Sequence, residues 1–99
     1  MVKQRVIAKL QECLSVLTNL DSVRASDPPF KKWRRDTEVA LEHIFGTETR
    51  HLRDFRGLTF TPSSYNMMNP DPAFAKAFAG GKGSAIALLE SMIDEVDEY

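Results

Sequence analysis

Two glycines divide the segment from Trp33 to Phe60 into helix, stop, helix and extended chain, and this division constrains the fold most strongly. Glycine accepts the left-handed conformation that ends many helices, so Gly46 and Gly57 each predict a helix end. Between them, Thr47 is placed to cap a short helix. The residues that follow, 58–61, alternate apolar and polar, which predicts an extended stretch too brief to found a sheet.

Apolar residues also recur at helical steps on both sides of this segment. They predict a lead helix over 1–20, a polar linker before Asp27, and a helix that begins at Asp27-Pro28, where proline sacrifices no hydrogen bond. We therefore expect an all-α fold, a small bundle of four to five helices in one domain. Its parts are the lead helix 1–20, the helix–stop–helix unit 28–61, a loop 62–70 and a helical region 71–99. The expected core is Leu10, Leu14, Leu17, Trp33, Leu41, Ile44, Phe45, Leu52, Phe55, Leu58 and Phe60.

The C-terminal region contains a conflict between two patterns. A regular apolar seam runs from Phe74 through Phe78 and Ala85 to Met92, yet it crosses the Gly80-Gly81-Lys82-Gly83 stretch. Each glycine costs about 1 kcal/mol in a helix interior. We expect a break there, with Ser84 capping a new helix; one unbroken helix is the alternative.

The loop 62–70 is unusually apolar, since it carries Tyr65, Met67 and Met68. We expect it to pack back on the core as a lid, and the alternative is an adaptable contact surface, for which methionine is well suited. A run of acids and no base closes the chain, which opposes the helix macrodipole. We expect this tail either to continue in a longer helix or to meet the basic side of its own or a neighbouring chain.

Composition excludes several classes of protein. The single cysteine, Cys13, allows no internal disulfide and no cysteine-based zinc site, and it falls on an apolar stripe as a buried structural thiol would. No apolar run is long enough for a membrane span, and the N-terminus has no signal-peptide pattern, so a cytoplasmic location is expected. A net charge of −1 gives no general attraction to nucleic acid.

Basic residues form the best candidate for a binding site. Arg50, Arg53 and Arg56 recur every three residues along one side of the short helix, and Lys82 lies in the glycine-rich stretch. Interleaved acids favour a solvated, salt-bridged face, although these bases are also candidates to hold an anion or an acidic partner. Candidate interface residues are the large apolar side chains Trp33, Tyr65, Phe74, Phe78 and Met92.

No catalytic constellation emerges from the sequence. The GGKGS stretch lacks the first glycine of a phosphate-binding loop, and its lysine is followed by Gly83. His43 and His51 have no carboxylates or cysteines at ligand spacing, so we expect surface or boundary histidines. We predict no metal site, no cofactor and no enzymatic activity.

One resemblance rests on the packing residues just described. The run WRRDTEVAL from Trp33 to Leu41, the IFG at 44–46, Phe55 and the LTF at 58–60 resemble a helical segment at the N-terminus of bacterial predicted nucleotide-binding and TIR-like proteins. The likeness extends to about residues 30–96. Several of those larger proteins are encoded in anti-phage defence loci, where the segment precedes a separate nucleotide-sensing or NAD-cleaving domain. The resemblance implies a scaffold without catalytic residues, either as a separated domain or as a small relative.

These patterns together predict a non-catalytic helical module for interaction or oligomerisation, as part of a bacterial defence-type system. Its partner would be a second copy of the chain or a separate domain, and a homo-oligomer is expected. Its mechanism would be burial of an apolar helix face, around Cys13 or along the Phe74, Phe78 and Met92 seam, with charges setting the orientation. The alternative function is a small nucleotide- or nucleic-acid-binding protein that uses the basic helix edge.

Overall fold

A computed structural model describes residues 2–20 and 24–99, and these residues form four helices with no strand among them. The helices are α1 (Lys3–Thr18), α2 (Pro28–Phe45), α3 (Arg50–Arg56) and α4 (Asp71–Glu98). The all-α prediction is confirmed. The predicted linker includes residues 21–23, which lie outside the described part of the chain.

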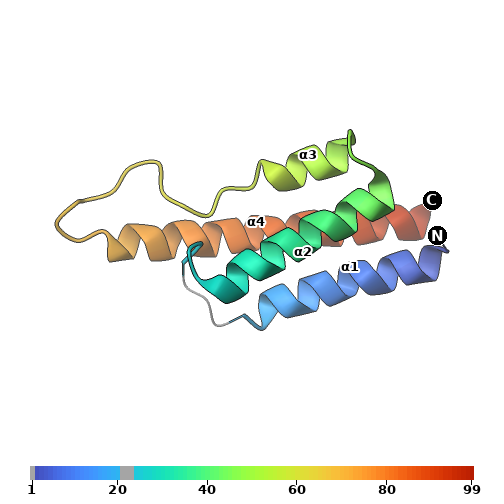
Figure 1. The fold of residues 1–99 in the computed structure, drawn as a ribbon, viewed down its shortest axis with the longest axis horizontal. Helices are drawn as coiled ribbons and strands as arrows, with labels where there is room; N and C mark the ends of the chain where they lie inside the picture. The colour runs from blue at the N-terminus through green and yellow to red at the C-terminus, as the bar shows by residue number, and fades with distance from the viewer. Residues whose placement is uncertain (1, 21–23) are drawn as a thin grey trace.

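The helices form an elongated bundle whose longest extent is 51 Å. Figure 1 shows α2 in front, α1 and α3 on either side of it, and α4 behind, along the whole length of the molecule. α4 packs antiparallel to α1 and also contacts α3. The first turns of α4 and the loop 61–70 extend together beyond the N-terminal end of α2 (Figure 1).

An aromatic cluster forms the centre of the core. The Phe30 ring lies 4.6 Å from Phe60, 4.9 Å from Phe78 and 5.7 Å from Trp33, centroid to centroid. The Trp33 indole N–H donates to the Cys13 carbonyl at 2.9 Å, which ties α2 to α1 inside the core. Every predicted core residue is buried or partly buried. The buried ones are Leu10, Leu17, Trp33, Leu41, Leu52, Phe55 and Phe60, and those partly buried against them are Leu14, Ile44, Phe45 and Leu58.

The predicted break in the last helix is wrong, because α4 is continuous through all three glycines. The extended segment 58–60 crosses α4 directly over Gly81, where an added Cβ would lie 2.3 Å from the Thr59 carbonyl oxygen and 2.5 Å from the Phe60 ring. Gly81 is therefore required by this close approach. Burial of Phe78, Ala85 and Met92 on the same seam offsets the glycine cost, since tertiary packing supplies most helix stability in proteins.

Helix ends follow the sequence in part. Gly46 ends α2 with a φ of +103°, as predicted. Gly57 ends α3 in ordinary right-handed backbone, so its predicted left-handed conformation is wrong. The cap of α3 is Thr49, whose hydroxyl accepts from the Leu52 N–H at 3.3 Å, and Thr47 lies in the preceding turn.

Asp27 is the N-cap of α2, yet its carboxylate accepts from the Arg24 N–H at 3.2 Å instead of from the helix. The two residues that follow are Pro28 and Pro29, which have no N–H to donate. α4 begins one residue earlier than a cap at Asp71 would place it, because Pro70 is its N-cap and Asp71 its first residue. The carboxylate of Asp71 pairs with Arg24 instead of capping the helix.

Candidate functional site

The four basic residues singled out in the sequence do not form one site. Arg50 lies 3.8 Å from Glu95 of α4, and Arg56 donates from Nε to Glu38 of α2 at 3.0 Å. Arg53 is exposed beside a shallow hollow of about 330 Å³. Lys82 lies on α4 thirteen residues before Glu95, about 20 Å along the helix axis. Arg50 and Arg56 therefore link α3 to α4 and α2, and neither Arg53 nor Lys82 joins them.

A histidine and a carboxylate meet where α3 crosses the end of α4. The Nε2 atom of His51 is hydrogen-bonded to Glu95, and the ring stacks on Phe45 with centroids 3.9 Å apart. His51 and Glu95 are far apart in the sequence. The one sequence signal for their contact was the charge difference between the arginines near His51 and the acidic residues at the end of α4. The tail does meet the basic side of its own chain, at Glu95 with Arg50 and His51.

This histidine–carboxylate pair connects α3 to α4. The second ring nitrogen of His51, Nδ1, is buried and has no hydrogen-bond partner among the described residues. A general base needs a nitrogen within hydrogen-bond reach of its substrate, and Phe45 covers one face of the ring. The contacts of His51 and Glu95 are therefore those of a hydrogen-bonded pair between two helices.

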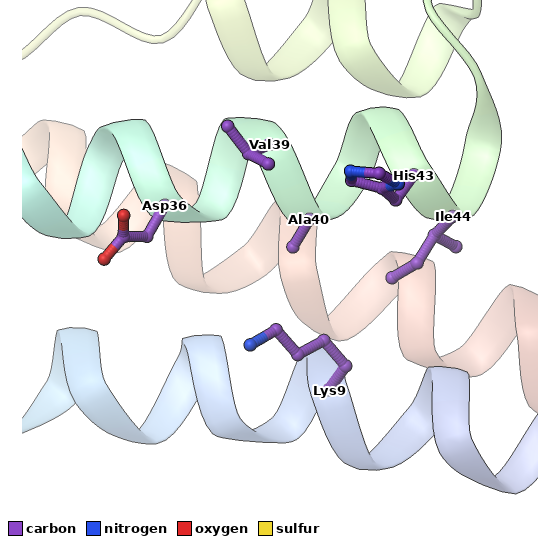
Figure 2. Close-up of a pocket in the computed structure, with 6 residues that line it drawn as sticks. All are labelled: Lys9, Asp36, Val39, Ala40, His43 and Ile44. Carbon is purple, nitrogen blue, oxygen red and sulfur yellow. The ribbon is translucent and has the colours of Figure 1, made fainter.

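A groove of about 520 Å³ lies between α1 and α2. Figure 2 shows Lys9 reaching from α1 toward α2, where Ala40 and Ile44 supply apolar surface. A second hollow of about 360 Å³ continues it past Cys13 and shares Lys9 and Asp36 with the first. Lys9 pairs with Glu12 at 3.6 Å and Asp36 with Lys32 at 2.6 Å. The two charged side chains that line both hollows therefore already form ion pairs within their own helices.

The candidate interface residues divide into two groups. Trp33, Phe78 and Met92 are buried in the core, so the prediction that they form a surface is wrong for this conformation. Tyr65 and Phe74 remain accessible and pack on each other, with ring centroids 5.0 Å apart. The Arg24 guanidinium lies 4.9 Å from the Phe74 ring centre.

The loop between α3 and α4 is not the lid that the sequence predicts. Met67 is 86% exposed and Met68 is 95% exposed, and only Tyr65 turns back toward a neighbour. Two exposed methionines fit the alternative, an adaptable contact surface. This part of the loop lies beside the first turns of α4, beyond the other three helices (Figure 1).

The outer face of α4 carries the most unusual surface of the molecule. We define this outer face as the exposed residues of α4 that point away from the core: Ala75, Lys76, Ala79, Gly80, Gly83, Ser84, Ala87, Glu90, Ser91 and Asp94. A helix of a globular protein normally presents charged and polar side chains to solvent. Here the middle of the face is alanine and glycine, with Ser84 and Ser91 along one edge, and a Cβ built at Gly80 or Gly83 meets nothing within 4 Å. Packing among the described residues therefore gives no reason for these two glycines.

Charge is distributed unequally along this outer face. Lys76 lies toward its beginning, whereas Glu90 and Asp94 lie toward its end. None of the three makes an ion pair within the described part of the chain. The face thus has a small, smooth centre between a basic and an acidic end.

Comparison with known proteins adds no relative: no family model matches the chain, and neither do curated proteins or solved structures. Within the described residues, no cluster of His, Cys, Asp and Glu has the composition to hold a metal ion. No helix there combines the length and the apolar character that a membrane span requires.

Proposed function

We propose that the chain is a non-catalytic oligomerisation module that associates with a second copy of itself through the outer face of α4. The single observation that carries this proposal is the alanine–glycine centre of that face, flanked by a basic and an acidic end. Small residues allow two helix backbones to approach closely, as they do at many helix–helix contacts. A chain with opposite charges at the two ends of one face complements its own copy.

The energetics of α4 support the same role. Gly80 and Gly83 each cost about 1 kcal/mol relative to alanine in a helix interior, and no neighbour in the described part of the chain requires them. A close contact with another chain would account for that cost. The α1–α2 groove is a weaker candidate, because its charges already pair within α1 and α2.

Light scattering tests the proposal directly. The expected mass is twice the 11.2 kDa of the chain at micromolar concentration and low salt, with dissociation on dilution. Ala87→Arg places a long charged side chain in the centre of the face and should give monomers. Gln11→Arg is the matched control on the exposed side of α1 and should leave the mass unchanged. A monomeric mass at both low and high salt, up to the solubility limit, would refute the function.

The biological setting within this proposal is a bacterial defence-type system, and its support is the resemblance of the Trp33–Phe60 segment to the helical part of such proteins. In that setting the module brings copies of a sensing or NAD-cleaving partner domain together. Phage plaque counts on cells with and without the gene test this setting. Equal plaque numbers across a panel of phages would remove the defence role and leave the oligomerisation proposal intact.

A further inference from the structure

We infer that two copies of this chain pair through α4 in an antiparallel arrangement with Gly83 on the twofold axis. This inference rests on the proposed function and deepens it, since it specifies which residues of the two copies meet. It follows from the geometry of the outer face, from its charges and from the direction of the helix.

The spacing of the exposed residues sets the crossing angle. Lys76, Gly80, Gly83, Ala87, Glu90 and Asp94 follow one another at alternating steps of four and three residues. Such spacing keeps a stripe facing a second helix that crosses at about 20°, as in coiled coils. At so shallow an angle, contact extends well beyond the crossing point. The small residues at the centre and the charges at both ends can therefore meet the partner at once.

The small residues place the axis. With Gly83 on a twofold axis, residues equally far before and after it face each other, so Ala79 meets the partner's Ala87 and Ala75 meets the partner's Ser91. The positions paired in this way are glycine, alanine or serine, the same axis places Gly80 opposite the partner's Ile86, and a Cβ at Gly83 would meet nothing within 4 Å among the described residues of its own chain. The backbones are free to approach at the lower end of the usual interaxial range, about 8 Å.

The charges fix the direction. The same axis brings Lys76 opposite the partner's Glu90, and symmetry makes this pair twice. A parallel arrangement would instead place Lys76 beside Lys76 and Glu90 beside Glu90, which is repulsive. All these side chains are exposed and have no ion pair in the described part of their own chain, so no intramolecular contact must break.

The antiparallel direction also accounts for the acidic end of α4. Asp94, Asp97 and Glu98 lie at the negative end of the helix dipole, where acids are unfavourable. With Gly83 on the axis, Asp94 lies opposite Pro72 in the first turn of the partner's α4, at the positive end of its dipole, and Asp97 and Glu98 lie just beyond that end. Among the described residues of one chain, only Glu95 of the last ten residues has such compensation, from Arg50 and His51.

Charge reversal provides the first test. Lys76→Glu creates repulsion at two symmetric sites and should weaken the dimer by about tenfold in dissociation constant. Glu90→Lys should do the same, and the double variant should return to within about threefold of the natural chain. Lys31→Glu makes the same change of net charge on the exposed surface of α2 and should have little effect. Additive weakening in the double variant would overturn the assigned pairing.

Cysteine cross-linking provides the second test, and it separates register from association. A mixture of the Ala79→Cys and Ala87→Cys chains should form a disulfide-linked dimer under a mild oxidant, because these two positions face each other across the pair within disulfide reach. Ala79→Cys alone faces the partner's Ala87, so it should not link to itself. In a parallel pair Ala79→Cys alone would link. The natural Cys13 is buried and should not contribute.

The outcomes separate this inference from the function that it rests on. A dimer by light scattering whose mixed Ala79→Cys and Ala87→Cys chains do not link, or whose Ala79→Cys variant alone links equally well, would overturn the antiparallel register and leave self-association standing. A chain that stays monomeric would overturn both. Thermal melting of each variant establishes that loss of the dimer does not come from loss of the fold.

Discussion

Gly81 and Gly83 lie two residues apart on α4, Gly81 on the side that faces the core and Gly83 on the side that faces solvent. Gly81 is buried beneath the extended segment 58–60, and an added Cβ would lie 2.3 Å from a backbone oxygen. Gly83 is exposed, and the space around it is open. The same residue type thus serves close packing on the inner face and leaves an unfilled surface on the outer face.

This difference separates two causes of a glycine in a helix. On the inner face, the packing of Phe60 and Phe78 against Phe30 compensates for the cost within one chain. On the outer face, no contact among residues 2–20 and 24–99 compensates for this cost, which is why we assign the compensation to a second copy. The inner face therefore determines the fold, and the outer face supports the proposed function.

The largest expected effect lies on the inner face, at Phe60. Phe60→Ala should lower the free energy of unfolding by about 3–5 kcal/mol, because it removes a buried ring that packs on Phe30, Phe78 and Gly81. Urea denaturation followed by circular dichroism measures this loss. Tyr65→Ala, which truncates an exposed ring in the loop, is the control and should change stability much less. Equal losses in the two variants would contradict the assigned core.

Gly81→Ala should have the next largest effect. Its new methyl group must displace the Thr59 carbonyl or the Phe60 ring, and such overpacking costs about 1–3 kcal/mol. Alanine's higher helix propensity offsets only part of that cost. The same urea denaturation measures it. A variant as stable as the natural chain would mean that segment 58–60 does not rest on α4 as closely as described.

On the outer face the same substitution should act in the opposite direction. Gly80→Ala and Gly83→Ala should each raise the free energy of unfolding by up to about 1 kcal/mol, since the methyl group meets no neighbour and the helix gains propensity. Measurement at a dilution that keeps the chain monomeric isolates this effect from association. A loss of stability at either position would show that an intramolecular contact had been missed.

The sequence was sufficient to predict the helices, because apolar spacing and glycine stops are local signals. Gly46 ends α2 as expected, and the buried seam through Phe78, Ala85 and Met92 has the predicted spacing. The break at the glycines was predicted from local propensity alone. What overrides it is the passage of Thr59 and Phe60 over Gly81, a contact between segments distant in the sequence.

The candidate sites were less predictable for the same reason. Arg50, Arg53 and Arg56 share one side of α3, as their spacing requires, but spacing could not show that Glu38 and Glu95 would pair with Arg56 and Arg50. Large side chains such as Trp33 fit either a core or an interface. Their burial depends on where α1 and α3 pack, which no local pattern specifies.

The smallest expected effect is a change of stability with pH, caused by the buried thiol of Cys13. Burial raises the pKa of the Cys13 thiol above its ordinary value of 9.0, and a hydrogen bond from Thr37 opposes this only in part. Because the folded chain holds the proton more tightly, this contribution to stability is fully present below pH 9 and is lost as the pH rises through the folded-state pKa. The stability difference between the natural chain and Cys13→Ala should therefore shrink above pH 9.

Alkylation rates supply the matching measurement on the outer face. At pH 8 a cysteine introduced at position 87 should react with iodoacetamide at the rate of an exposed thiol, whereas Cys13 should react only as fast as the chain opens. Raising the concentration until the chain pairs should then slow the reaction at position 87 and leave Cys13 unchanged. If association protected neither thiol, the contact between copies would have to lie away from the outer face of α4.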